Sequence, residues 1–342
     1  MRFPEFKGEW KEKNMEKIAP LQRGFDLPTQ NIKKGEVPII YSNGVLNLHN
    51  ISKCTAPGLI TGRSGTIGKF TYIESGNYWP HNTTLWVTDF CNNHPRFIYY
   101  LYQSININQF ATGSGVPTLN RNDVHKKKCH IPSFREQEKI SKFLSLLDQQ
   151  IETQNKIIEQ YKSLIKGITH YILKGKEADV KLKDCVACHS SSLTESEFER
   201  NNGQYPVYGA TGIIAYSSQY NVNEDSILVI KDGAGVGRVQ YVTGKYSVIG
   251  TLNYLTVKND FSLLYIYYLL SCFNFDKYKV GSGIPHIYFK DYGNELIYCP
   301  PIEEQDKIAK LLFFIEEKLK TEQILLKTYI FQKEYLLQKL FI

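Results

Sequence analysis

Two stretches of the chain place apolar residues at alternating steps of four and three, the spacing that keeps one stripe of a long helix buried. The first stretch begins at Ile140 and ends at Ile168, and the second begins at Ile308 and ends at Leu336. Between these limits the seam positions are Leu144, Leu147, Ile151, Gln154, Ile158, Tyr161 and Ile165, and then Leu312, Ile315, Leu319, Glu322, Leu326, Tyr329 and Lys333. The pattern is typical of a coiled-coil seam, with one polar layer at the same level of both helices.

Signals for a helix start precede both stretches. Ser133 followed by Glu136 predicts a capping box, and Pro301 suits the first turn of the second helix. We expect the first helix to run from Phe134 to Lys174, before Gly175. Each helix would have about 41 residues and extend roughly 60 Å at 1.5 Å per residue. A single globular block between these helices is too small to bury a helix roughly 60 Å long. We therefore expect the two long helices to pack against each other in an antiparallel orientation.

The chain repeats itself at an offset of 168 residues (300 − 132). Residues 132–140 (PSFREQEKI) return as 300–308 (PPIEEQDKI), and residues 113–117 (GSGVP) return as 281–285 (GSGIP). Short β-branched runs such as residues 227–230 (ILVI) predict strands in the blocks between the helices.

The repeat predicts a mixed α+β fold in which two repeated globular domains are separated by two long antiparallel coiled-coil helices. The expected boundaries are 1–130 and 176–298 for the globular domains, and 131–175 and 299–342 for the helical segments.

Composition narrows the class of protein only a little. Hydrophobic residues make up 42% and charged residues 22%, as in ordinary globular domains, and the net charge of +7 permits a polyanionic partner. The start of the chain shows no signal peptide, and the apolar stretch 261–275 is too short and too Tyr-rich for a membrane span. We therefore expect a cytoplasmic protein with reduced cysteines.

Two patterns hint at cofactor chemistry without supporting it. Residues 185–189 (CVACH) match a haem-attachment pattern, but their repeat partner, residues 17–21, contains no cysteine. Residues 233–237 (GAGVG) lack the spacing of a dinucleotide-binding loop, and no Walker A sequence is present. We expect no metal, no cofactor and no catalytic site in this chain.

The order of these features resembles the specificity subunit of type I restriction-modification enzymes. A globular block, a Gly-Ser-Gly-x-Pro loop, a Pro-x-x-x-Glu-Gln helix start and a long helix each occur twice. Residues 3–6 (FPEF), 62–69 (GRSGTIGK) and 79–84 (WPHNTT) match as well. No single motif is specific, but together they cover essentially the whole chain.

The resemblance implies a function. Each globular block would be a target-recognition domain that reads one half of a bipartite DNA sequence, and the helices would set the gap between the half-sites. The helices would also hold two modification subunits, which carry the methyltransferase, and restriction subunits with an ATP-dependent nuclease would join them. S-adenosylmethionine, ATP and Mg²⁺ would bind to these partners.

The sequences of the two globular blocks differ at positions where two domains that read different DNA sequences are expected to differ. Helix starts match closely between the copies, whereas residues 77–82 have no clear partner in residues 245–250. We therefore predict an asymmetric target with two different half-sites.

Candidate DNA-reading residues are polar or cationic side chains in loops, because Arg suits guanine, Asn suits adenine and Lys suits phosphate. In the first domain the candidates are Arg63, Lys69, His81, Asn82, Asn120 and Arg121. In the second domain they are Lys231, Arg238, Lys245, His286, Tyr288 and Lys290.

Three other hypotheses compete with this one. A self-sufficient enzyme acting on DNA would need a catalytic motif, and we find none. A non-catalytic scaffold would use the Tyr-rich domains to bind protein or glycan. A specificity protein could also serve another kind of DNA methylase-nuclease.

Overall fold

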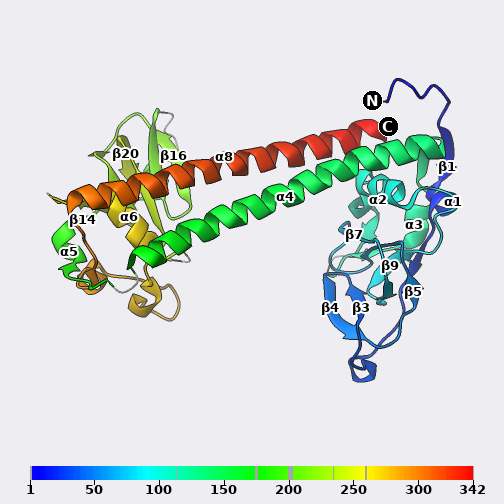
Figure 1. The fold of residues 1–342 in the computed structure, drawn as a ribbon, viewed down its shortest axis with the longest axis horizontal. Coiled ribbons are helices and arrows are strands. Elements are labelled where there is room, and N and C mark those ends of the chain that lie inside the picture. Colours follow the sequence, from blue (N-terminus) through cyan, green and yellow to red (C-terminus); the bar gives the residue numbers. More distant parts are fainter. Residues whose placement is uncertain are drawn as a thin grey trace. The chain divides into compact units, whose positions relative to one another are not determined.

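The computed structural model describes residues 2–113, 115–173, 176–198, 203–233, 235–258 and 260–341. The chain divides into two compact units, Met1–Asn155 with Ile324–Ile342, and Lys156–Gln323. Two long helices, α4 (Phe134–Leu173) and α8 (Ile302–Leu340), each contribute one segment to each unit (Figure 1).

The first domain comprises the elements that precede α4. They are β1 (Lys11–Asn14), α1 (Met15–Ile18), β2 (Leu21–Arg23), η1 (Thr29–Asn31), β3 (Val37–Tyr41), β4 (Gly44–His49), β5 (Cys54–Thr55), β6 (Gly58–Gly62), β7 (Phe70–Ile73), β8 (Asn77–Pro80), β9 (Thr84–Val87), α2 (Pro95–Ser104), η2 (Ile107–Phe110), β10 (Ala111–Thr112), β11 (Thr118–Leu119), α3 (Arg121–His125) and β12 (Lys128–Ile131).

The second domain comprises the elements between α4 and α8. They are β13 (Val180–Lys181), α5 (Leu182–Cys185), β14 (Val186–Ser190), η3 (Glu195–Phe198), β15 (Tyr205–Gly209), β16 (Gly212–Ser217), β17 (Val222–Asn223), β18 (Ser226–Ile230), β19 (Val239–Val242), β20 (Lys245–Val248), β21 (Leu252–Val257), α6 (Leu263–Ser271), η4 (Phe275–Tyr278), α7 (Phe289–Tyr292) and β22 (Leu296–Ile297).

Both domains contain the same two four-stranded sheets. The strand orders are β2-β9-β6-β7 and β4-β3-β8-β5 in the first domain, and β14-β21-β18-β19 and β16-β15-β20-β17 in the second. All the pairs within these sheets are antiparallel except β3–β8 and β15–β20. The predicted α+β fold and its duplication are therefore confirmed, and the sheet order is a result of the structure alone.

The core of each domain extends into the long helices. Tyr100 and Leu101 of α2 are buried in one cluster with Leu144 of α4 and Leu337 of α8. In the second domain Tyr265 and its neighbours in α6 share a cluster with α8. The apolar stretch 261–275 is thus a core helix and its flanks, and among the described helices none has the length and apolar character that a membrane crossing requires.

One buried glutamine in each domain ties a long helix to the domain beside it. The Gln137 Oε1 accepts the backbone N–H of His94, the N-cap of α2, at 2.9 Å, and Gln137 Nε2 donates to Pro132 O at 3.1 Å. Gln305 repeats this arrangement with Ser262 N–H at 2.9 Å and Pro300 O at 2.8 Å. The two residues are 2% and 1% exposed, so these hydrogen bonds satisfy polar groups that water cannot reach.

The predicted capping box is only half formed. Ser133 Oγ accepts from the Glu136 N–H at 3.4 Å, as predicted. The Glu136 carboxylate instead accepts from Arg2 Nε and Nη2, both at 2.7 Å, and from Trp10 Nε1 at 3.3 Å. Because this side chain is 1% exposed, a charged partner stabilises its carboxylate more than a backbone N–H could.

The long helices begin at the predicted start signals, and α8 begins at Ile302, directly after Pro301. Helix α4 begins at Phe134, and its predicted end at Lys174 and the stop at Gly175 lie outside the described residues. In the first unit the segments of α4 and α8 run antiparallel, and Lys333 pairs with Asp148 at 2.6 Å. Every seam position is buried or half-buried in both helices.

We expect Gln137→Leu and Gln305→Leu each to lower the free energy of unfolding. Leucine fills a similar volume but leaves a buried N–H and a buried carbonyl unpaired, at about 1–3 kcal/mol per group. Urea denaturation followed by circular dichroism measures the change. Gln150→Leu, at an exposed position of α4, is the matched control. An equal loss in the control would contradict the anchoring role of the buried glutamines.

Candidate nucleic-acid interface

Two loops that are distant in sequence meet in the first domain. Leu119 N–H donates to Arg63 O at 2.7 Å, and Gly65 N–H donates to Pro117 O at 3.3 Å. Gly65 has a φ of 79°, a conformation that favours glycine. The glycine-rich segment 62–69 and the Gly-Ser-Gly-x-Pro loop are thereby held together, although Ser114 of that loop lies outside the described residues.

The second domain builds the same contact from equivalent residues. Ile287 N–H donates to Lys231 O at 3.0 Å, and Gly233 N–H donates to Pro285 O at 3.0 Å. Gly233, with a φ of 94°, takes the place of Gly65. The backbone frame of the two loop pairs is therefore duplicated together with the sheets.

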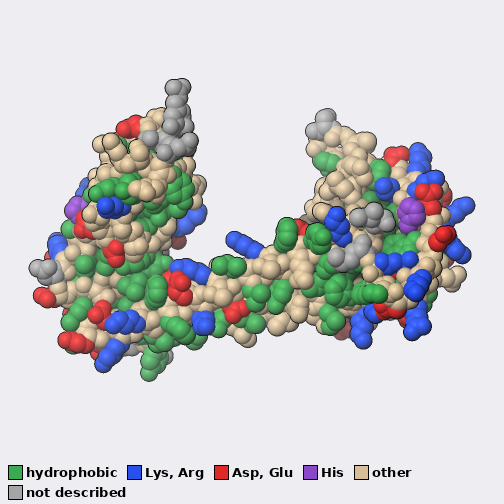
Figure 2. All heavy atoms as spheres, turned by 90° about the horizontal axis from the view of Figure 1, so that it is seen from above, with side chains coloured by type: hydrophobic (Ala, Val, Ile, Leu, Met, Phe, Trp, Pro, Cys, Tyr) green, Lys and Arg blue, Asp and Glu red, His purple; other side chains and the backbone are tan. Residues whose placement is uncertain are grey.

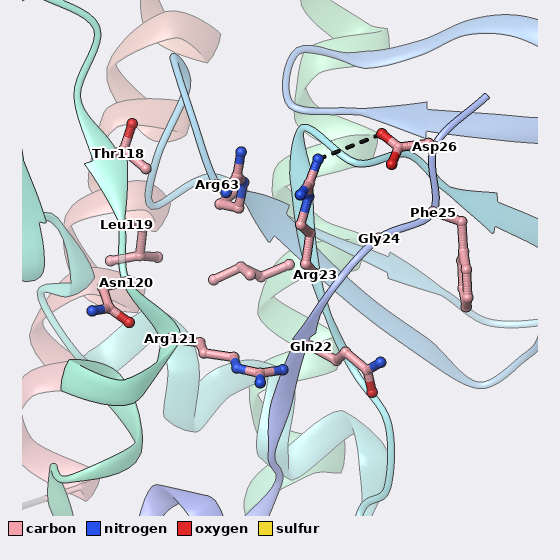
Figure 3. A pocket seen from close by; sticks show the side chains of 11 residues that line it. Gln22, Arg23, Gly24, Phe25, Asp26, Arg63, Thr118, Leu119, Asn120 and Arg121 are labelled. Atoms are coloured by element: carbon pink, nitrogen blue, oxygen red, sulfur yellow. Dashed lines mark hydrogen bonds and ion pairs between the residues drawn. The ribbon is translucent and has the colours of Figure 1, made fainter. Parts of the chain in front are cut away.

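A crevice of about 650 Å³ lies beside the first loop pair. It is lined by Gln22, Arg23, Gly24, Phe25, Asp26, Arg63, Leu85, Thr118, Leu119, Asn120 and Arg121. Figure 3 shows that the three arginines reach the crevice from three segments, the ends of β2 and β6 and the start of α3. The lining contains three guanidinium groups and one carboxylate, so the crevice favours an anionic or acceptor-rich ligand.

The arginines differ in how they are held. Arg23 Nη2 pairs with Asp26 Oδ1 at 3.4 Å. Arg63 Nε is buried and has no hydrogen-bond partner among the described residues. Such a donor is unusual in a folded protein, and an acceptor supplied by a ligand would satisfy it.

The amide candidates are partly engaged within the domain. Asn120 Oδ1 accepts from Asn122 N–H at 3.0 Å and caps α3. A bidentate contact with adenine needs both amide atoms, so Asn120 could make one only by giving up this cap. Asn82 Nδ2 donates to Asp26 Oδ1, the oxygen that also pairs with Arg23. Asp26 therefore holds two potential base readers side by side.

His81 and Lys69 lie outside the lining of the crevice. The His81 ring packs on Tyr41 with centroids 4.3 Å apart, and its Nδ1 is 3.1 Å from Thr83 Oγ1. Burial lowers the pKa of His81, so its imidazole is neutral near pH 7. Lys69 is exposed and precedes β7.

Four of the six second-domain candidates lie together. Lys231 and His286 belong to the paired loops, and His286 Nδ1 is 2.6 Å from Asp232 Oδ1. Lys290 lies over the Tyr288 ring at 5.3 Å, and Tyr288 is 50% exposed.

The structure places the other two second-domain candidates elsewhere. Arg238 lines a separate crevice of about 170 Å³ beside Gly209 and Gly212. Lys245 starts β20, in the other sheet, and lies over the Tyr220 ring at 4.9 Å.

Sequence reasoning missed Arg23, Gln22 and Asp26. They lie in or just after a three-residue strand and match no motif, and the sheet registers make Ser190 the equivalent of Arg23. Only the pairing of β2 with β9 brings them to the crevice. His125 supports this strand, because its Nε2 accepts the Leu21 N–H at 2.9 Å.

Equivalent positions around the two loop pairs hold different chemistry on the same backbone frame. The sheet registers pair Arg23 with Ser190, and the 168-residue offset pairs Arg63 with Lys231, Thr118 with His286, Asn120 with Tyr288, and Arg121 with Phe289. The two surfaces therefore present unlike sets of donors and acceptors.

The duplicated two-sheet domains joined to long helices are also the fold of a solved type I specificity subunit. A crystal structure of the type I restriction-modification S subunit from M. genitalium aligns with a TM-score of 0.72 and 18% identity, over 100% of this chain and 99% of that chain. The chain belongs to the family described as type I restriction modification DNA specificity domain, whose model matches residues 7–162 and 175–328.

Two further comparisons agree with this membership. A Mycoplasma genitalium protein whose name assigns it as a type I specificity subunit is 23% identical over 97% of this chain and 94% of its own length. A solved chain from work on complex assembly and conformational transition of a type I restriction-modification system aligns with a TM-score of 0.57 and 14% identity, over 97% of both chains.

We expect low pH to reduce the stability of the first domain at strand β2, which ends in Arg23. Burial lowers the pKa of His125 below its unfolded value of about 6.5. The neutral ring therefore contributes stability above that value, and the contribution is lost as the pH falls through the folded pKa. Urea denaturation at pH 7.5 and pH 5.5 should show a smaller loss for His125→Gln than for the unmodified chain.

Exposed His130 provides the control for this measurement. His130→Gln should lose as much stability between the two pH values as the unmodified chain does. If His125→Gln behaved in the same way, His125 would not be the titrating group that supports β2.

Proposed function

We propose that this chain is the non-catalytic DNA-reading subunit of a type I restriction-modification complex, and that each domain reads one half of an asymmetric, bipartite target. The observation that carries the proposal is the pair of duplicated loop frames whose equivalent positions hold unlike side chains. A repeated frame suits two readers of one duplex, and unlike side chains suit two different half-sites.

The crevice of the first domain suggests how its half-site is read. Arg23 and Arg63 have the fork geometry that matches the O6 and N7 acceptors of guanine, and either also suits a phosphate. Asp26 acts as a positioning residue, because it orients the Arg23 guanidinium and the Asn82 amide together. The second domain offers instead a lysine, a histidine paired with a carboxylate, and an exposed tyrosine.

The long helices are the proposed scaffold for the partners. Phe143 and Leu146 of α4 are 36% and 51% exposed, and their repeat equivalents, Leu311 and Phe314 of α8, are 51% and 60% exposed. Figure 2 shows apolar side chains among charged ones along the surface of these helices. Two equivalent apolar pairs suit two copies of one partner, the modification subunit.

The chemistry of the complex would reside in the partners. The modification subunits would use S-adenosylmethionine, and restriction subunits would use ATP and Mg²⁺. The helices would set the spacing between the two half-sites.

Sequencing of modified adenines in host DNA, with and without this gene, tests the reading function. We expect a bipartite motif with different halves that disappears with the gene. In an Arg63→Ala strain the motif should become degenerate at one position of one half, because an arginine–guanine pair contributes about 1–3 kcal/mol of discrimination. A phosphate contact would instead reduce the salt slope of binding by about 1.

Arg135→Ala removes an exposed arginine from the first turn of α4 and should leave the motif intact. A palindromic motif would contradict two unlike readers. Unchanged methylation, affinity and salt slope in the Arg63→Ala complex would exclude Arg63 as a DNA contact.

We expect the two apolar pairs to hold one modification subunit each. Leu146→Lys and Phe314→Lys should each reduce the complex from two modification subunits to one, because a buried unpaired ammonium opposes docking. The double variant should bind none. Native mass spectrometry gives the stoichiometry, with Ser163→Lys as the control on another face of α4. Two bound subunits in every variant would refute this docking surface.

A further inference from the structure

The N-terminal arm, residues 2–10, covers one face of α4 in the first unit. Arg2 forms two hydrogen bonds with the Glu136 carboxylate, both 2.7 Å, and Phe3 meets Phe143 edge-on with ring centroids 5.9 Å apart. Lys139 lies over the Phe3 ring at 4.8 Å and pairs with Glu5. The start of α4 thus binds an arginine, an aromatic ring and an acid in order.

The start of α8 presents the same chemistry without a cover. Glu304, Lys307 and Leu311 stand at the positions equivalent to Glu136, Lys139 and Phe143. All three are exposed, and none of the described residues forms an ion pair or a side-chain hydrogen bond with the Glu304 carboxylate. In contrast, the Glu136 side chain is 1% exposed. We call Glu304, Lys307 and Leu311 the open α8 surface.

The repeat explains why none of the described residues of the second unit covers this surface. The strand pairs β1–β12 and β13–β22 align Lys13 with Val180 and Asn14 with Lys181, an offset of 167 residues (180 − 13). At this offset the residues equivalent to Arg2 and Phe3 are Thr169 and His170, which belong to helix α4 and not to an extended arm. Glu177 stands where the first unit has Trp10, so the indole donor to the carboxylate is missing as well.

We infer that the open α8 surface binds a segment of the modification partner in which an arginine is followed by an aromatic residue, as Arg2 and Phe3 are here. The inference rests on the proposed function for the identity of the partner. Its chemistry rests on the occupied twin in the first unit and on charge complementarity, since Glu303 and Glu304 make the first turn of α8 acidic.

The arm of a second copy of this chain is a less favourable occupant. Withdrawing the arm from its own α4 would leave the Glu136 carboxylate without its cation at a position that water does not reach. The two helix starts are therefore unequal: the arm binds Glu136 and Lys139 on α4, whereas the equivalent residues of α8 are left for a partner. Leu146 and Phe314, further along the two helices, stay exposed on both.

A peptide of residues 1–10 (MRFPEFKGEW), with a benzophenone amino acid in place of Phe3, tests the surface directly. We add it at millimolar concentration to the full-length chain, irradiate and map the cross-links by mass spectrometry. We expect cross-links to residues 307–314. Glu304→Arg should reduce them at least tenfold, and a peptide carrying Arg2→Glu should restore them in that variant. Asp306→Arg makes the same charge change on another side of the same helical turn and should have no effect.

Cross-links that survive Glu304→Arg, or that fall only around Phe143 through exchange of the arm, would overturn the inference. Neither DNA nor the modification subunit takes part in this step, so its failure is separate from failure of the proposed function. The purified modification subunit is then added to compete with the peptide. Displacement supports the partner assignment, and persistence of the cross-links at saturating modification subunit overturns it.

Discussion

A buried glutamine amide at the start of each long helix determines how a globular domain is attached to that helix. Gln137 and Gln305 each accept a backbone N–H from the first turn of a domain helix and donate to the carbonyl of a proline just before the long helix. Both hydrogen-bond partners are backbone groups, so the glutamine amide fixes the orientation of the domain helix relative to the long helix as well as the contact between them. A leucine would fill the same space but would hold neither group.

A second contact supports this attachment a few turns along the long helix. Tyr100 OH donates to Asp148 at 2.7 Å, and Tyr268 OH donates to Glu316 at 2.8 Å. These carboxylates occupy equivalent positions of α4 and α8. The domain helix is therefore tied to the long helix at two levels, and rotation of the domain about either contact would break the other. The proposed reading of two spaced DNA half-sites would need such stiffness, because the gap between them would depend on it.

The duplicated frame separates scaffold from specificity. Backbone hydrogen bonds hold the paired loops in both domains, and these bonds tolerate almost any side chain at the surface. The side chains that face outward can then diverge, as Arg63 and Lys231 have, without disturbing the sheets. The two long helices differ in a similar way, because the N-terminal arm covers the start of α4 but not the equivalent start of α8.

Local periodicity and the internal repeat predicted the long helices, the two domains and the unlike half-sites, and the resemblance of the duplicated motifs to type I specificity subunits predicted the family. These features depend on residues close in sequence or on direct comparison of the two halves. The crevice required the tertiary structure, because Arg23 and Asp26 reach Arg63 only through the pairing of β2 with β9 and β9 with β6. The same folding left Lys69 outside the lining of the crevice, placed Lys245 in the other sheet of its domain and engaged Asn120 as a helix cap. Contacts between segments distant in the chain leave no period in the sequence, and for that reason only the fold could decide them.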